Sequence, residues 1–422
     1  KNLPHSKVLH TIDEREQICD NCGSTMVKVG EEFVRTEVQF IPAKLKVIDH
    51  YQETYECRSC RKNGTPYMEK APVPYPPVLH SLASASTITW LIHQKFELSI
   101  PLYRQEKEWE ALGLRLSRAT MSNWLLVVYR DWLVHIVHRL KLELLKQRYL
   151  HIDETHVQVL KEPGRKNTSD SYMWVYCSIR DAVNSIRYFE YQPGRSGKYP
   201  EAFLREYEGY IHTDAYSGYN AVSGVKRCLC YTHLRRAFVD ALPKDIHNSE
   251  ASKAAEAILR LNQLFNIESE LEALPPDQKK KERLIREKPL LEAFWSWAEK
   301  SAIGELPKSK LSKAFHYALN NREGFWNYLE DGNCSISNSL AENCIRPFVI
   351  GRKNWLFSGS PKGAEASAGI YTLVETAKAN GLAPMKYIKY ILSDMPGSAF
   401  LEHPEYLDDY LPWNPLVKEF CR

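Results

Sequence analysis

Two aspartates in this 422-residue chain follow segments that predict short β-strands. Asp153 lies in Tyr149-Leu-His-Ile-Asp-Glu-Thr and Asp214 in Tyr210-Ile-His-Thr-Asp-Ala-Tyr, both rich in β-branched and aromatic residues. If the two strands are neighbours, carboxylates 61 residues apart (214 − 153) come within reach of one metal ion. A single aspartate after a strand is more often a solvated turn former, so the prediction depends on the pair.

One reaction that paired aspartates can support is phosphoryl transfer on DNA, which requires oxygen ligands for two Mg²⁺ or Mn²⁺ ions roughly 3.5 to 4 Å apart. Two aspartates are too few to hold both ions, so a third carboxylate is needed. A helix over residues 337–345 would place Asn338, Glu342 and Arg346 on one face, with Arg346 free to bind a phosphate. The alternative for Glu342 is a surface ion pair. The rival carboxylates are Glu154, which should leave the opposite strand face from Asp153, and Glu323, Glu330 and Asp331.

Four of the ten cysteines form two C-x-x-C pairs separated by 34 residues, and the other six are scattered. The paired residues are Cys19, Cys22, Cys57 and Cys60. Two thiolate pairs supply the tetrahedral ligand set of zinc and leave no position for water, so a structural zinc is expected. The alternative is four reduced thiols on two hairpins, and alternating residues at 33–40 and 44–48 predict a small β module around them.

Several polar and basic residues are candidates for contact with DNA. The helical pattern over residues 82–145 is interrupted at Gly113, and Ser117 is a good N-cap, which resembles a helix-turn-helix. A helical bundle with a solvated basic face would give the same pattern. The residues expected to face a DNA groove are Arg118, Ser122 and Asn123.

A second group of candidates begins at Cys230-Tyr-Thr-His233, after the fifth expected strand. One Cys-x-x-His pair cannot fill a zinc coordination sphere, so His233 is expected to support the acidic residues or contact DNA, the alternative being a buried core histidine. Basic residues near aromatic ones can bind backbone phosphates and stack on bases. These basic residues are Arg235, Arg236, Arg346, Arg352, Lys353 and Lys362.

The charge of the chain is concentrated in two segments. The whole chain has 56 Lys and Arg against 52 Asp and Glu, but residues 101–148 carry +4 and residues 343–389 carry +5. Two basic segments suit a polyanion that contacts several domains. With 44% hydrophobic residues, the composition excludes a fibrous or largely disordered protein, and no apolar run is long enough for a membrane helix. The first ten residues show no secretory signal pattern.

The order of expected elements predicts an α/β protein with an RNase H-like core, because strands and helices follow one another as βββαβα from residue 149. The expected segments are a zinc-binding module at 1–65, a Pro-rich linker at 66–80, a helix-turn-helix domain at 81–147, core parts at 148–242 and 332–382, a helical insertion at 243–331 and a C-terminal element at 383–422.

Taken in order, these motifs resemble the DDE transposases of the insertion-sequence-66 group over almost the whole chain. The matching segments include the two C-x-x-C pairs, Leu98-Ser-Ile-Pro-Leu-Tyr-Arg-Gln, His151-Ile-Asp-Glu-Thr, His212-Thr-Asp-Ala-Tyr, Cys230-Tyr-Thr-His-Leu-Arg-Arg and Asn338-Ser-Leu-Ala-Glu-Asn-Cys-Ile-Arg-Pro. The resemblance implies a catalytic triad of Asp153, Asp214 and Glu342. Tyr231 stands where the family commonly has Trp.

The resemblance implies a bacterial cytoplasmic, nucleoid-associated transposase. It would cut DNA at the ends of its own mobile element and join the freed 3′ hydroxyl to target DNA, with Mg²⁺ or Mn²⁺ at the triad and a structural Zn²⁺. The expected partners are the element's terminal repeats, target DNA, a second copy of the chain and accessory proteins of the same element, with no membrane contact. The alternatives are a DNA-binding regulator with an inactive core and a nuclease that only hydrolyses DNA.

Overall fold

A computed structural model describes residues 7–36, 44–243 and 252–422, and the chain divides into two compact units, Lys1–Asp49 and His50–Arg422. The first unit has one short 3₁₀ helix, η1 (Glu14–Glu16), and an isolated β-bridge between Ile18 and Thr25. The bridge closes the turn that carries Cys19 and Cys22, where Gly23 has a φ of 70°.

The expectation of strands at 33–40 and 44–48 is wrong for residues 33–36 and 44–48, which form no strand, and residues 37–43 lie outside the described part. The alternating apolar side chains at these positions pack against nothing, since Val34 is 77% and Val47 is 80% exposed. Alternation predicts a strand only where a sheet and a core exist to receive one face.

The second unit begins with a two-stranded antiparallel hairpin around the other cysteine pair. Its elements are β1 (Thr54–Glu56), α1 (Arg58–Lys62) and β2 (Met68–Lys70). Strand β2 lies inside the Pro-rich segment 66–80, where the sequence predicted only an extended connector. The prolines flank residues 67–71, so these residues keep the N–H groups that pairing requires.

The helical segment before the main sheet agrees closely with the helices expected over 82–145. It comprises α2 (Ala85–Ile92), α3 (Leu102–Ala111), α4 (Arg118–Val128) and α5 (Val134–Leu145), with π-helical turns after α2 and between α4 and α5. Gly113, with a φ of 91°, ends the turn after α3. The Ser117 side chain accepts a hydrogen bond from the Thr120 N–H and caps α4.

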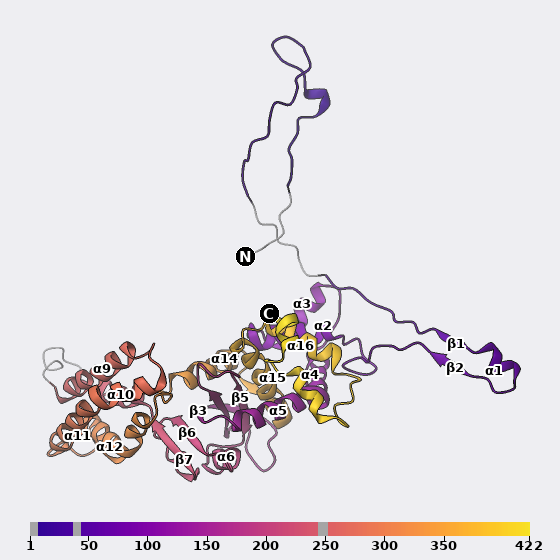
Figure 1. Cartoon of the computed structure of the whole chain (residues 1–422). Helices are drawn as coiled ribbons and strands as arrows, with labels where there is room; N and C mark the ends of the chain where they lie inside the picture. Colours follow the sequence, from indigo (N-terminus) through magenta and orange to yellow (C-terminus); the bar gives the residue numbers. More distant parts are fainter. Residues whose placement is uncertain (1–6, 37–43, 244–251) are drawn as a thin grey trace. The chain divides into compact units, whose positions relative to one another are not determined.

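The main sheet mixes antiparallel and parallel strands in the order β5-β4-β3-β6-β7 (Figure 1). Its strands are β3 (Tyr149–Val159), β4 (Asp170–Ser178), β5 (Arg187–Gln192), β6 (Gly209–Thr213) and β7 (Val225–Leu229), with the short β8 (Phe357–Ser358) beside β3. Strands β3, β4 and β5 are antiparallel, whereas β6 and β7 run parallel to β3. All five central strands lie where the sequence predicted them.

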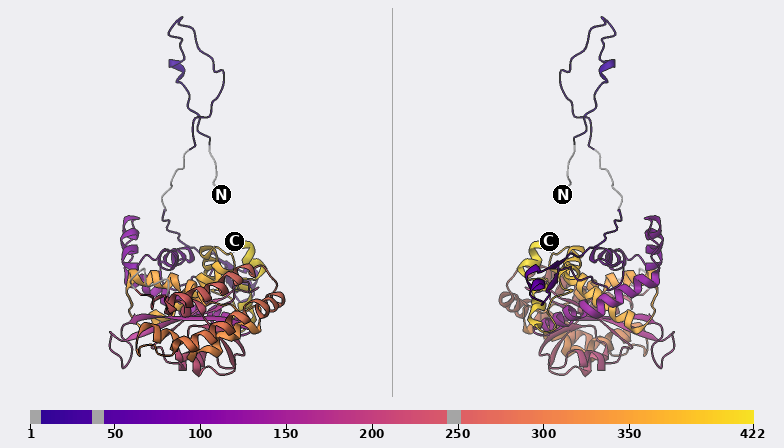
Figure 2. Two further views of the ribbon diagram at one scale, coloured as in Figure 1. Left: turned by 90° about the vertical axis from the view of Figure 1, so that its left-hand side faces the viewer. Right: turned by 90° about the vertical axis from the view of Figure 1, so that its right-hand side faces the viewer.

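Helices cover both faces of this sheet (Figure 2). On one face lie α14 (Ser339–Trp355), which contacts β3 and β4, and α15 (Pro361–Ala379), which contacts β5. On the other face, the ring of Phe203 in α6 (Lys198–Phe203) stacks on Tyr176 with centroids 3.6 Å apart. Tyr219 in η4 (Ser217–Ala221) packs edge-on against Trp174 on this same side. Alternate residues of β4 therefore face α14 and α6.

Between β7 and α14, the chain leaves the sheet and forms a helical insertion beside β6 and β7 (Figure 1). Its elements are α7 (Tyr231–Val239), α9 (Lys253–Glu270), α10 (Pro276–Arg286), α11 (Lys288–Ala302), α12 (Lys310–Asn320), α13 (Arg322–Trp326) and η5 (Asn327–Glu330). Helices α10 and α11 are separate, because Pro289 lies at the start of α11 and disfavours a continuous helix there. The insertion has its own buried core, built on Phe238, Trp295 and Phe315.

The C-terminal segment closes the unit with α16 (Pro384–Asp394), η6 (Pro404–Tyr410) and α17 (Pro415–Cys421). Helix α14 is longer than the expected 337–345 and continues through Pro347 to Trp355. Within the described ranges, no helix combines the length and apolar character needed to cross a membrane.

Candidate active site

The pairing of β3 with β6 sets Asp153 and Asp214 at equivalent positions on adjacent strands. The strands are parallel, and His151 pairs with His212, each two residues before its aspartate. Neighbouring strands lie about 4.8 Å apart. Asp153 pairs with Val175 and His151 with Cys177 on β4, positions that face α14. Asp153 therefore leaves the sheet on the α14 side, and Asp214, one residue past the end of β6, lies near enough for its charge to raise the pKa of Asp153.

Helix α14 brings Glu342 to this side of the sheet from its first turn. The Glu342 N–H donates to the carbonyl of Asn338, the residue that caps the helix. The Asn338 side chain is buried against β3, where its Nδ2 donates to the Ile152 carbonyl at 2.7 Å and its Oδ1 accepts from His151 Nδ1 at 2.9 Å. One asparagine thus ties the turn that carries Glu342 to the strand that carries Asp153.

The three carboxylates act on one another electrostatically. Burial raises the pKa of Asp153 to about 7, and the negative charges of Glu154, Asp214 and Glu342 act in the same direction. A carboxyl group with such a pKa lacks a cation that would stabilise its charged form. A bound divalent ion would supply that charge, so the residues present fit a metal site of oxygen ligands.

Glu154, the nearest rival, leaves the opposite face of β3, as the sequence predicted. It pairs with Trp174, whose ring lies on the Tyr219 side of the sheet. Its carboxylate accepts from the Tyr219 hydroxyl and from Arg195, with Arg195 Nη2 2.6 Å from Glu154 Oε1. The same Nη2 lies 3.9 Å from Asp214 Oδ2. Glu154 is therefore already paired with a cation.

The other rival carboxylates lie away from the three acids or have partners of their own. Asp331 accepts from the Tyr149 hydroxyl at 2.7 Å, and Glu330 pairs with Lys226. Glu323 is exposed on α13.

Two cationic side chains from α7 approach Glu342. His233 Nδ1 lies 3.7 Å from Glu342 Oε1, and Arg236 Nη2 lies 3.8 Å from Glu342 Oε2. A hydrogen bond with Cys230 raises the pKa of His233, helped by the charges of Glu342 and Asp214. The donor atoms of Cys230, His233 and Glu342 all lie within 4.8 Å of one another. His233 thus lies beside Glu342.

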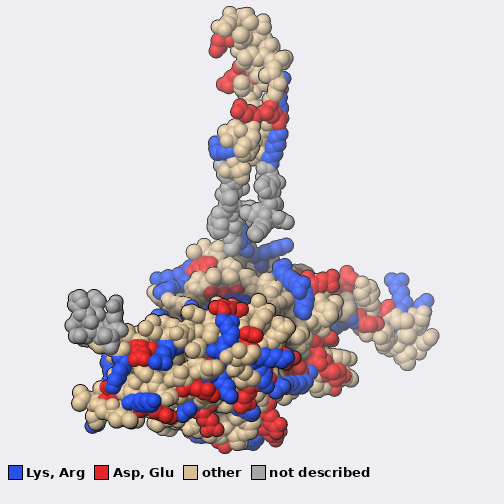
Figure 3. Space-filling view, turned by 60° about the vertical axis from the view of Figure 1, so that its left-hand side comes forward, with Lys and Arg blue, Asp and Glu red and all other residues tan. Residues whose placement is uncertain are grey.

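The expected DNA-contacting residues fall into two groups. Those whose side chains are exposed are Arg118, Asn123, Arg236, Arg346, Lys353 and Lys362, while Ser122 is half-buried. Arg235 instead donates to Asn262 of the insertion at 2.7 Å, and Arg352 donates to Thr155 of β3 at 3.0 Å. Figure 3 shows basic and acidic side chains intermixed over the face it presents, with no large area of one sign.

Sequence reasoning missed Arg195, which links Glu154 to Asp214. It lies in Pro193-Gly-Arg-Ser-Gly197, directly after β5. A Cβ on Gly197 would meet the Gly218 carbonyl oxygen at 2.3 Å, so the loop packs tightly against the segment after Asp214. The sequence feature that could have identified Arg195 is its position between two glycines at the end of an expected strand, where the backbone can approach another segment closely.

One cysteine of each N-terminal C-x-x-C pair has surroundings that favour a thiolate. Cys22 accepts a hydrogen bond from the Ser24 backbone N–H, and Cys57 accepts one from the Cys60 backbone N–H. In each case this bond is the largest cause of a lowered thiol pKa. Backbone N–H groups directed at sulfur stabilise thiolates, the form that binds zinc. The donor set of each pair fits half of a four-thiolate site.

Comparison with known proteins gives two family matches. The model described as "Transposase IS66 family" matches residues 80–366, and that described as "zinc-finger binding domain of transposase IS66" matches residues 16–61, a range that includes all four cysteines. The second match supports a structural zinc. The first match covers more than half of the chain and includes Asp153, Asp214 and Glu342.

Three similar proteins come from Sinorhizobium fredii and carry the descriptions "Uncharacterized protein" y4hP, y4jD and y4qI. The y4hP protein is 26% identical over 432 residues, which cover 95% of this chain and 75% of that protein. The y4jD protein is 26% identical, with 98% and 81% covered, and y4qI is 27% identical, with 97% and 76% covered.

Proposed function

Because the chain belongs to the IS66 transposase family, we propose that it cuts DNA at the ends of a mobile insertion sequence and joins the freed 3′ hydroxyl to target DNA. The observation that carries the proposal is the parallel pairing of β3 with β6, whose last pair, His151 and His212, lies two residues before Asp153 and Asp214. The effect of Asp214 and Glu342 on the pKa of Asp153 supports a single acidic site. The strand order, three antiparallel strands followed by two parallel ones, supports an RNase H-like core.

In this proposal, Asp153, Asp214 and Glu342 hold two Mg²⁺ or Mn²⁺ ions against the phosphodiester that is cut. When bound, such ions activate the attacking oxygen and stabilise the leaving one. Arg195 holds Glu154 away from the ions and supports Asp214 from the other side. His233 and Arg236 orient Glu342, and Arg346, one turn further along α14, binds a neighbouring phosphate.

The remaining modules would select the DNA. We propose that the four cysteines share one structural Zn²⁺ and that this module and the helix-turn-helix formed by α3 and α4 bind the terminal repeats. The exposed residues Arg118 and Asn123 on α4 suit such contacts. A homodimer would pair the two element ends, and accessory proteins of the same element would assist.

The test is Mg²⁺-dependent nicking of DNA that carries the element ends, with a chelator as control. Asp153→Asn, Asp214→Asn and Glu342→Gln should each abolish nicking while end binding is retained, because the amides keep the shape but lose the charge. Asp181→Asn is the control: Asp181 is an exposed acid in the turn after β4, and this variant should nick DNA like the wild type. Wild-type nicking by any of the three variants contradicts its assignment.

Two other outcomes would replace the proposal. A wild-type protein that binds the ends without cutting would be a DNA-binding regulator. One that cuts but yields no joined products in the presence of target DNA would be a hydrolytic nuclease.

A further inference from the structure

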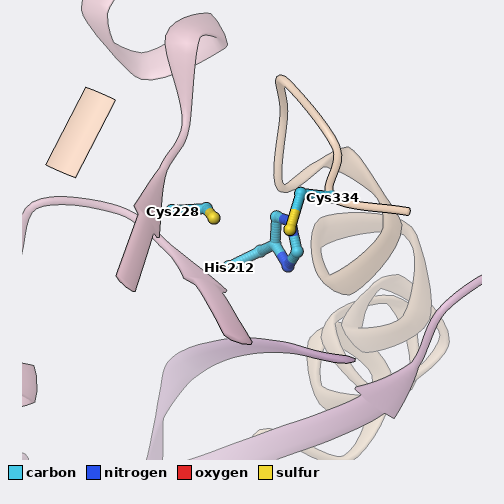
Figure 4. Close-up of side chains that lie close together, drawn as sticks. All are labelled: His212, Cys228 and Cys334. Carbon is cyan, nitrogen blue, oxygen red and sulfur yellow. The ribbon is translucent and has the colours of Figure 1, made fainter. Parts of the chain in front are cut away.

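A second group of side chains that could bind a metal lies in the interior of the protein (Figure 4). His212 comes from β6, Cys228 from β7 and Cys334 from the segment before α14. One donor atom from each lies within 4.8 Å of the other two. All three residues are 1% exposed. Figure 4 shows the two thiols and the imidazole directed into one shared space.

The hydrogen bonds of the His212 ring leave the correct nitrogen for a metal. Nδ1 donates to the Leu150 carbonyl at 3.1 Å, which places the lone pair of the ring on Nε2. Metal-bound histidines commonly donate their other N–H to a backbone carbonyl in this way. Nε2 accepts the Ser335 backbone N–H at 2.8 Å, a contact that a bound ion would replace.

The two thiols are positioned to act together. Cys228 and Cys334 hydrogen-bond to each other, and a donor nitrogen of His212 lies within 4.8 Å of both sulfurs. Two thiolates and a neutral imidazole balance the charge of a divalent ion, which matters because a buried net charge is costly. Sulfur and imidazole ligands select zinc-class ions over Mg²⁺.

We propose that His212, Cys228 and Cys334 bind a zinc-class divalent ion inside the core, in addition to the zinc of the N-terminal module. The three side chains leave the fourth tetrahedral position to a water. His212 is two residues before Asp214, and Cys334 is eight residues before Glu342 (342 − 334 = 8). The ion would therefore fasten β6 and β7 to the segment that leads into α14. This site does not depend on the proposed reaction.

The test measures zinc per chain by elemental mass spectrometry on the full-length protein, purified under reducing conditions and dialysed. The wild type should retain about two zinc ions, and Cys228→Ser or Cys334→Ser should retain about one. Cys344→Ser is the matched control. Cys344 contacts Cys177 in another buried thiol pair that, in the described part of the chain, belongs to no three-residue metal-binding group. It should keep both ions.

A wild-type content of one zinc, equal loss in the Cys344→Ser variant, or a Cys228–Cys334 disulfide found by peptide mapping would overturn the proposal. Loss of the second ion in Cys230→Ser but not in Cys334→Ser would also overturn it, because the ion would then lie at Cys230, His233 and Glu342. If the serine variants do not fold, titration of the wild-type protein with cobalt tests whether the second metal site exists. Two spectroscopically distinct sites, one with four thiolates and one with two, are expected, and a single four-thiolate spectrum contradicts the site.

Discussion

The acidic residues of this site differ in how closely a side-chain cation approaches them: Arg195 Nη2 lies 2.6 Å from Glu154, whereas the cations beside Asp214 and Glu342 lie 3.7 to 3.9 Å away. Burial and like charges leave Asp153 with a raised pKa, whereas Arg195 and Tyr219 occupy the Glu154 carboxylate one residue further along β3. Adjacent strand residues face opposite sides of a sheet, so two neighbouring acids acquire different chemistry.

This difference predicts unequal effects of two neutralising substitutions. Asp153→Asn should reduce nicking at least about 100-fold, because a metal ligand is lost. Glu154→Gln should cost less than about tenfold, because the amide oxygen can still accept from Arg195 while the amide NH2 donates to the Tyr219 oxygen, and Arg195 is 39% exposed and can be hydrated. Single-turnover nicking at saturating Mg²⁺ measures both. Equal losses would mean that Glu154 is itself a metal ligand.

Two acids of the site could be proposed from the sequence, and the third could not be chosen without the resemblance. Asp153 and Asp214 each follow a β-rich run, and a strand end is a local signal. The helical spacing around Glu342 is common among surface glutamates and does not identify a metal ligand. Two rival acids are excluded only by their partners in the structure, because Glu330 pairs with Lys226 and Asp331 accepts from Tyr149. Those contacts join residues far apart in the chain, so no periodicity reveals them.

At the scale of elements, the position of α14 on the sheet depends on Asn338. Asn338→Ala would leave His151 Nδ1 and the Ile152 carbonyl buried without partners, at a cost of about 1–3 kcal/mol in the free energy of unfolding. Because Glu342 lies one turn away, the nicking rate at saturating DNA and Mg²⁺ should fall while end binding is unchanged. Ser339→Ala, at the exposed next position, is the control and should change neither quantity. A variant that is destabilised but nicks at the wild-type rate would show that Asn338 does not position Glu342.

The insertion contains a buried proton whose loss should weaken the fold. Glu287, between α10 and α11, accepts from Tyr328 at 2.6 Å, and burial together with the Glu268 charge raises its pKa to about 8. Its ordinary value is 4.5, so the folded chain holds a proton that the unfolded chain has released. Stability is therefore full below pH 4.5 and is lost as the pH rises towards 8.

Glu287→Gln removes this titration while keeping a donor towards Glu268. The variant should gain stability over the wild type as the pH rises from 5 to 8, by at most about 1.4 kcal/mol per pH unit. Urea unfolding at several pH values measures the difference. Glu292→Gln, exposed on α11, should show no such trend. A difference that is constant with pH would mean that Glu287 is ionised in the folded chain.

The elements that the sequence predicted well are those whose patterns meet a core. Helices α2 to α5 bury one face, which their periodicity reports, and the central strands are buried on both faces, which their runs of β-branched and aromatic residues report. The pattern at 33–36 and 44–48 has the same alternation but no surface to cover, so it forms no strand. The extension of α14 through Pro347 runs against the local preference of proline and depends on the packing of α14 on the sheet.

On the scale of the whole molecule, the zinc-finger region and the core should unfold independently. Every residue of the two buried cores lies at or after Val78. Cys57 and Cys60 lie before that point, next to the exposed strands β1 and β2. Cys57→Ser should therefore weaken binding to the element ends and leave the main melting temperature within about 2 °C of the wild type, since no core contact is lost.

Phe348→Ala, in the core face of α14, is the contrasting variant and should destabilise the same transition by about 3–5 kcal/mol. Calorimetry of both variants, with end binding measured at one fixed salt concentration, separates the two effects. If Cys57→Ser lowers the main melting temperature as much as Phe348→Ala does, the zinc-finger region and the core form one cooperative unit. The effect of Cys57→Ser on DNA binding then follows from lost stability of that unit.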